Sequence, residues 1–364
     1  MSNSSDIMVS ICCTVFNHEK YLRKCLDGFV EQKTNFKYEV LIHDDASTDS
    51  SADIIREYEA KYPDMIKPIY QTENQYSKGI SISKTYQYPR VNGKYIALCE
   101  GDDYWINENK LQLQYDYMEA NNTCTAYVHN AILYLVEHNR KTAMLRYKKE
   151  KEFFLDDFLN MRNWFPTSSF FVRKDIIINN PEEIKLNDRG DFPIMLNAAL
   201  QGYIHYSPQI MSVYNYGTNG SWTNRQKTLD LIKQAEICRD FRSIYINADK
   251  LSSYKYHSCF LKKVLKQEYL YYRILNNKKR FSYKYFEFLV EDIIKAPFVK
   301  TKKLLRRLCE KISVNSKTVI KTLCCERLDN SRSDFFTVYN GHCNLSRFCG
   351  YQPDGIKRSG MESG

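Results

Sequence analysis

Short apolar runs alternate with amphipathic segments along the first hundred residues. Apolar runs of five to nine residues, bounded by polar clusters, are typical of strands that are buried on both faces. Such runs cover 8–14, 38–43, 66–70 and 95–99. Apolar residues recur at helical spacing over 21–30 and 54–62, and more weakly over 82–91. Alternating strands and helices predict an α/β fold, with a mostly parallel, doubly wound sheet covered by helices on both faces.

The pattern changes after residue 105. It predicts a helix over 111–118, a long strand over 125–136, a charged hairpin or loop over 141–151 and a short helix over 153–161. An aromatic and then apolar stretch follows at 164–172. A further helix is expected to open at Asp191, with Pro193 in its first turn.

Polar residues follow three of the predicted strands. Thr14 and Asn17 end the first strand, the pair Asp44 and Asp45 ends the second, and Asp102-Asp103 follows the strand that begins near Tyr95. The carboxyl ends of parallel strands open on one edge of a sheet, so these groups should line one crevice. Adjacent carboxylates repel unless they are compensated, and a divalent cation that also binds substrate phosphates would compensate them. The alternative is that these residues only cap the following helices.

Composition narrows the class of protein. Hydrophobic residues make up 43% and aromatic residues 14% of the 364 residues, which excludes a disordered chain. The 12 cysteines include two adjacent pairs and no CxxC spacing, which favours buried, reduced thiols. We find no secretion signal at the start and no run of about 20 apolar residues, so a cytoplasmic location is expected.

The net charge of +10 is unevenly distributed. Residues 225–364 hold 29 Lys and Arg against 14 Asp and Glu, a charge of +15, which leaves −5 for residues 1–224. The segment 298–312 is basic and amphipathic. It is either an ordinary helical extension or a peripheral contact with anionic membrane lipid, each basic residue near the surface contributing ~1 kcal/mol. Bulky apolar residues among these lysines argue against nucleic-acid binding.

Three segments together resemble the family 2 glycosyltransferases. They are residues 9–22 (VSICCTVFNHEKYL), 38–51 (YEVLIHDDASTDSS) and 93–105 (GKYIALCEGDDYW). The resemblance extends over roughly residues 8–220 and implies a GT-A fold, a Rossmann-like nucleotide-binding half joined to an acceptor half. The expected organisation is a glycosyltransferase domain over 1–224, with halves at 8–105 and 106–224. A basic helical extension would follow over 225–330, and the tail at 331–364 shows little pattern.

The resemblance also implies roles on the donor side. Thr14, Phe16 and Asn17 would line the nucleoside pocket, and Asp45 would accept a hydrogen bond from the pyrimidine. The family often has an arginine five residues after a glycine, on the diphosphate; here Lys84 follows Gly79 at that spacing. Asp102 would face the ribose or sugar. Asp103 would bind Mn²⁺ or Mg²⁺.

On the acceptor side, Asp191 would be the catalytic base, with Asp188 as the alternative. Trp164 is a candidate for the floor under the sugars, although an aromatic cluster is more often core. The implied reaction is inverting transfer of one sugar from a nucleotide-sugar donor, a UDP-sugar first, to a glycan or polyprenyl-linked acceptor in bacterial surface-polysaccharide synthesis.

Two departures from the family pattern matter. A Tyr-Arg-x-His-like segment that can complete the metal or diphosphate site is replaced by Tyr214-Asn215-Tyr216-Gly217. The Gln-x-x-Arg-Trp motif of processive synthases is absent, which favours single transfers. A nucleotidyltransferase or other sugar-nucleotide-binding enzyme is the alternative, but the first strand is not followed by a glycine-rich phosphate loop.

Overall fold

The computed structural model describes residues 7–161, 164–185, 190–218 and 229–276. Its strands are β1 (Ile7–Val15), β2 (Lys37–Asp44), β3 (Ile66–Tyr70), β4 (Tyr95–Leu98), β5 (Tyr104–Trp105), β6 (Cys124–Leu135), β7 (Arg140–Ala143), β8 (Lys151–Phe153), β9 (Phe171–Arg173) and β10 (Tyr203–Tyr216). Its helices are α1 (Glu19–Val30), α2 (Ser51–Lys61), α3 (Lys110–Ala120), α4 (Leu155–Asn160), α5 (Lys174–Ile178), α6 (Asp191–Gln201), α8 (Leu231–Leu251) and α9 (His257–Asn276).

One sheet runs through both predicted halves, in the order β3-β2-β1-β4-β9-β6-β10-β5. The first four strands are parallel, and Cys12 of β1 lies between Leu41 of β2 and Leu98 of β4. The short strand β9 then pairs antiparallel with both β4 and β6. The long strands β6 and β10 are parallel to each other, while β5, β7 and β8 pair antiparallel with them. The predicted α/β fold is confirmed, with a block of four parallel strands, β3-β2-β1-β4, and a separate parallel pair, β6 and β10.

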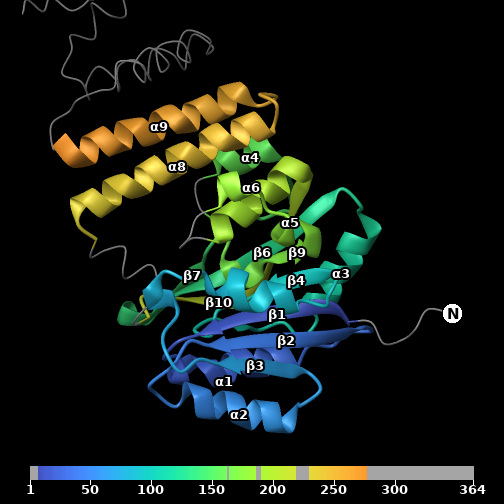
Figure 1. Ribbon diagram of the computed structural model, residues 1–364. Helices are drawn as coiled ribbons and strands as arrows, with labels where there is room; N and C mark the ends of the chain where they lie inside the picture. The colour runs from blue at the N-terminus through green and yellow to red at the C-terminus, as the bar shows by residue number, and fades with distance from the viewer. Residues whose placement is uncertain (1–6, 162–163, 186–189, 219–228, 277–364) are drawn as a thin grey trace, which may run out of the picture. The chain divides into compact units, whose positions relative to one another are not determined.

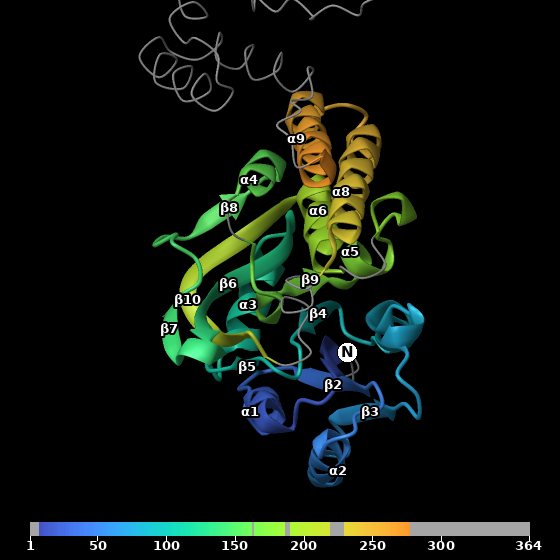
Figure 2. The ribbon, with the colours of Figure 1, turned by 90° about the vertical axis from the view of Figure 1, so that its left-hand side faces the viewer.

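The alternation of side chains along β1 explains why both faces are covered. Val9, Ile11 and Cys13 point into a core that also holds apolar residues of α1, α2 and α3. Cys12 points into the opposite core, which is shared with α4, α5, α6 and α8. Figure 1 shows α1 and α2 next to β1–β3, and Figure 2 shows α6 and α8 beyond the other face. The layers are therefore helix, sheet and helix.

The segment 82–91 differs from the predicted weak helix. It forms a π turn at Ser83–Gln87 followed by a 3₁₀ turn at Tyr88–Arg90. The buried Gln87 amide donates hydrogen bonds to the backbone carbonyls of Cys13 and Leu41, which draws this segment onto the sheet. Pro89 cannot continue a regular helix. This segment forms one side of the pocket described below.

Helix α8 packs on α6 through aromatic contacts. The Phe192 ring of α6 lies 5.1 Å from that of Phe241 and 5.8 Å from that of Tyr245, measured between centroids. The Asn247 amide donates to the backbone carbonyl of Glu183 at 2.7 Å. The basic segment 298–312 lies outside the described residues. Within the described chain, no helix is both long and apolar enough to cross a membrane.

Candidate active site

A pocket of about 1180 Å³ lies at the carboxyl ends of the parallel strands. Six of the predicted site residues line it: Thr14, Phe16, Asp45, Lys84, Asp102 and Asp191. They come from the ends of β1, β2 and β4, from the π turn and from the start of α6. The topology therefore brings together residues that are up to 177 positions apart in the sequence.

The loops after β1 and β2 are tied to each other by Asn17. Its backbone has a φ of 58°, in the left-handed region that asparagine tolerates better than most residues. The Asn17 side-chain oxygen accepts from the Thr48 backbone amide at 2.7 Å, and the Asn17 backbone amide donates to the Ser47 hydroxyl at 2.9 Å. Asn17 does not line the pocket. Its contacts fix the loops that carry Phe16 and Asp45.

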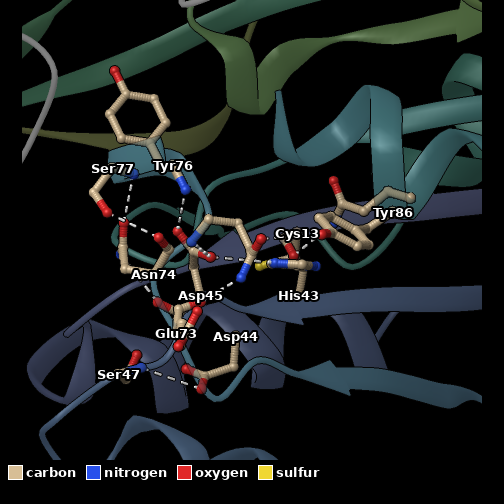
Figure 3. Close-up of polar contacts among 12 residues, drawn as sticks. Cys13, His43, Asp44, Asp45, Ser47, Glu73, Asn74, Tyr76, Ser77 and Tyr86 are labelled. Carbon is tan, nitrogen blue, oxygen red and sulfur yellow. Dashed lines mark hydrogen bonds and ion pairs between the residues drawn. The ribbon is translucent and has the colours of Figure 1, made fainter. Parts of the chain in front are cut away.

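Asp45 binds the loop at residues 74–77, which forms part of the pocket wall. Its carboxylate accepts from the backbone amides of Gln75 at 2.8 Å and Tyr76 at 3.0 Å, and only 4% of the residue is exposed. Figure 3 shows the Asp45 side chain turned toward this loop, while Asp44 points away toward Ser47. Each carboxylate oxygen has two lone-pair sites, so Asp45 keeps acceptor capacity for an N–H of a ligand. Tyr76, 37% exposed, also lines the pocket.

The neighbour of Asp45 inside the sheet is an uncharged histidine. His43 Nε2 lies 3.6 Å from Asp45 Oδ1, and the His43 ring is 4.9 Å from that of Tyr86. Burial lowers the pKa of His43, and this outweighs the opposing effect of Asp45. His43 therefore supports the loop as a neutral ring and leaves the Asp45 charge available to the pocket.

The acidic turn, residues 100–103 between β4 and β5, places alternate residues on the pocket. Glu100 and Asp102 line it, and Gly101 separates them. A Cβ on Gly101 would lie 2.8 Å from His18 Nδ1 and 2.9 Å from Val15 Cγ2. The Gly101 amide donates to the Thr14 carbonyl at 2.9 Å. The glycine thus allows the turn to lie against the end of β1.

Asp103 was expected in the pocket but is not among the residues that line it. It is 1% exposed, does not line the pocket, and its Oδ1 accepts from the Asn215 amide at 2.9 Å. Burial, followed by the nearby charge of Asp102, raises the pKa of Asp103 well above its usual range. Because Asp102 lines the pocket and Asp103 does not, Asp102 is the better placed of the two for a cation.

The other side of the pocket carries Asp191 and a group of charged residues. Asp191 is the first residue of α6, and its Oδ1 accepts from the Phe192 amide at 2.8 Å. The helix begins at Asp191 as expected, and Gly190 occupies its N-cap position. Lys84 Nζ lies 3.0 Å from Glu182 Oε1, and Lys185 Nζ lies 2.7 Å from the same oxygen. Lys84 therefore reaches the pocket paired with a carboxylate.

Two further candidates, besides Asn17 and Asp103, are not placed in the pocket. Trp164 is 45% exposed and packs its ring on Phe158 and Phe192, with centroids 5.6 Å and 5.0 Å apart, but it does not line the pocket. Asp188 lies outside the described residues. The pocket also has lining residues that the sequence did not single out, including Asn74, Tyr76, Glu100, Lys174 and Lys185. Of these, only Glu100 had a signal, its place beside the Asp-Asp pair.

The acidic turn offers limited ligands for a cation. Among the described residues, no group of three or more His, Cys, Asp or Glu side chains could hold a metal ion by itself. Hard divalent cations in nucleotide sites are often held by one or two carboxylates and by substrate phosphates. Asp102, 6% exposed and on the pocket, fits that arrangement.

Comparisons with known proteins agree with this geometry. Residues 10–179 match the family described as glycosyl transferase family 2. An uncharacterized protein of Mycobacterium tuberculosis is 33% identical over 224 residues, which are 60% of this chain and 63% of that protein. A poly(ribitol-phosphate) beta-glucosyltransferase of Bacillus spizizenii is 34% identical over 114 residues, or 31% of this chain and 17% of the relative. The chain thus spans less than two thirds of the length of either relative.

A solved structure shows the same fold. TarS 1-349 of S. aureus, in complex with UDP-GlcNAc, aligns with a TM-score of 0.55 at 17% identity, over 82% of this chain and 84% of that one. At this identity the likeness concerns the fold alone. Together with the family match and the strand-end residues in one pocket, it confirms the resemblance seen in the sequence. The similarity to the glycosyl transferase family 2 extends over residues 10–179.

Proposed function

We propose that this protein transfers one sugar from a nucleoside-diphosphate sugar to a hydroxyl of a glycan or lipid-linked acceptor. A UDP-sugar is the first candidate for the donor. The observation that carries the proposal is the single pocket that joins the ends of β1, β2 and β4 to the start of α6. Its strand-end side holds an aromatic ring, Phe16, and a carboxylate, Asp45, that suit a nucleobase with an N–H. Its far side holds Asp191. The Bacillus spizizenii relative is described as a poly(ribitol-phosphate) beta-glucosyltransferase, and this supports a role in surface-polysaccharide synthesis.

The donor is assigned to the acidic turn and to Lys84. We place the cation on Asp102 rather than on Asp103, and Glu100 beside the ribose or sugar, because Glu100 and Asp102 line the pocket while Asp103 does not. Bound Mn²⁺ or Mg²⁺ would neutralise charge that develops on the departing diphosphate. Lys84 would add a further positive charge there after leaving Glu182.

Asp191 is assigned as the general base. Its carboxylate lies on the pocket across from the donor side and would take the proton of the attacking hydroxyl. General-base assistance of this kind typically contributes ~10²–10⁴ in rate. Attack on the face opposite the departing diphosphate inverts the anomeric centre, and no carboxylate of the protein is needed as a nucleophile.

A pair of isosteric variants tests the assignment of the acidic turn. Asp102→Asn should remove the Mn²⁺-dependent part of UDP binding, measured by calorimetry, because it removes a charged oxygen from the pocket. Asp103→Asn should keep most of that binding, because Asp103 does not line the pocket. The reverse result, with Asp103→Asn losing metal-dependent binding and Asp102→Asn keeping it, would return the metal to Asp103.

A further inference from the structure

Asn215 near the end of β10 and Thr218 just after it make three hydrogen bonds to the acidic turn. The Asn215 amide donates to Asp103 Oδ1 at 2.9 Å, and the Asn215 side-chain amide donates to the Asp102 carbonyl. The Thr218 hydroxyl donates to Asp102 Oδ2 at 2.7 Å. All four residues are buried, with exposed fractions of 6% or less. These bonds connect positions that are up to 116 residues apart in the chain.

Strand pairing brings the two segments together. In β10, Ser212 and Val213 pair antiparallel with Trp105 and Tyr104 of β5. The Ile106 amide also donates to the Met211 carbonyl at 2.9 Å. Because β5 follows the acidic turn directly, this pairing places Asn215 and Thr218 beside Asp102 and Asp103. The contact is thus built into the sheet.

The two kinds of hydrogen bond constrain different degrees of freedom. The bonds of Asn215 hold the backbone of the turn, through the Asp102 carbonyl, and the neighbouring Asp103 side chain. The bond of Thr218 holds the Asp102 carboxylate, whose terminal torsion is otherwise broad. With Oδ2 engaged by Thr218, the orientation of Oδ1 on this pocket-lining residue is also fixed.

We propose that Thr218 and Asn215 are positioning residues that orient the Asp102 carboxylate for the donor and its cation. The inference deepens the proposed function and depends on it. Hydrogen bonds to charged groups are stronger than those between neutral groups. Loss of an outer hydrogen-bond partner of a metal ligand typically lowers metal affinity ~10–100-fold. Neither residue needs to touch the substrate to have this effect.

The test is a calorimetric measurement of Mn²⁺ affinity in the presence of saturating UDP. Thr218→Val keeps the branched shape of the side chain and removes the hydroxyl, so we expect Mn²⁺ affinity to fall about 10–100-fold. UDP affinity without metal should be unchanged. Thr218→Ser restores the hydroxyl and should recover most of the lost affinity.

Thr125→Val is the matched control. The Thr125 hydroxyl is also buried, and it donates to the carbonyls of Ala198 at 2.8 Å and Tyr203 at 3.0 Å, within the acceptor half. This variant should lose stability in thermal unfolding while keeping the wild-type Mn²⁺ affinity. A general weakening of the fold would affect the two valine variants alike.

Three results would overturn the inference. Wild-type Mn²⁺ affinity in Thr218→Val would show that the hydroxyl does not orient the ligand. An equal loss in Thr125→Val, or failure of Thr218→Ser to recover affinity, would show that the effect is not due to this hydrogen bond. If the wild-type protein did not bind UDP at all, whether Mn²⁺ or Mg²⁺ was present or absent, the proposed function itself would fail. That result is distinct from the three above.

Discussion

Lys110 is an unusual residue for the interior of this fold. It opens α3 with no exposed surface, and its Nζ lies 3.8 Å from the Trp105 ring centroid. The amine donates to Gln114 Oε1 at 2.8 Å. Burial lowers the pKa of Lys110 from 10.5 to about 7. The residue lies under the strand that follows the acidic turn, so its protonation affects the stability of that region.

The lowered pKa predicts a pH dependence of stability. Between about pH 10.5 and pH 7 the unfolded chain binds a proton at Lys110 that the folded chain does not bind, so this residue lowers stability as the pH falls through that window. The slope is at most about 1.4 kcal/mol per pH unit. Lys110→Met should remove this slope. The variant should therefore lose less free energy of unfolding than the wild type when the pH falls from 9 to 7, as measured by urea denaturation.

Lys37→Met, at an exposed position of β2, is the control for the loss of one positive charge. It should change the pH profile little. Parallel profiles for the wild-type protein and Lys110→Met would contradict a lowered pKa at this position.

The sequence predicted well which residues belong to the pocket, and poorly where neighbouring side chains point. Thr14, Phe16, Asp45, Lys84, Asp102 and Asp191 were all expected on the pocket and line it. Asp102 and Asp103 could not be distinguished from the sequence, because neighbouring residues in a turn point in different directions that only the contact with Asn215 decides. Asn74 and Tyr76 belong to a loop without periodicity, so nothing in the sequence indicated that Asp45 would hold them.

At the scale of elements, α1 lies unusually close to β5. A Cβ on Gly28 would lie 2.8 Å from the Trp105 carbonyl oxygen and 3.1 Å from the Trp105 amide nitrogen. The Phe29 and Trp105 rings meet edge to face, with centroids 4.7 Å apart. The glycine therefore allows the helix to press directly on the backbone that follows the acidic turn.

Gly28→Ala tests this close packing. Alanine is the better helix former by about 1 kcal/mol, but overpacking against fixed backbone typically costs about 1–3 kcal/mol. We expect a net loss in the free energy of unfolding, measured by urea denaturation. Lys20→Ala, at an exposed position of the same helix, should stay within about 0.5 kcal/mol of the wild type. Equal or greater stability of Gly28→Ala would show that α1 can move away from β5 at little cost.

Elements with strong periodicity were predictable, and those fixed by distant contacts were not. The strands at 7–15, 37–44 and 66–70 match the apolar runs closely. The segment 82–91 departs from a helix because the Gln87 amide bonds to two strands. The antiparallel insertion of β9 between β4 and β6 also had no local signal, since three residues cannot show a period.

In the molecule as a whole, one continuous sheet builds the pocket. The parallel strands supply the predicted donor side, and the segments after β9 supply Asp191, Lys185 and the apolar wall that includes Ile177 and Ile194. The helices α8 and α9 add to the core behind α6. Membrane attachment through residues 298–312 remains a prediction from charge alone.

The most direct test of the central claim is calorimetric binding of UDP to the full chain, with and without Mn²⁺, with GDP, CDP and dTDP as competitors for the same pocket. We predict that UDP binds and that Mn²⁺ strengthens the binding, because Asp45 suits the base and Asp102 suits the cation. If none of the four nucleotides bound the folded protein under either condition, the strand-end carboxylates would be structural and the proposed transfer reaction would be contradicted.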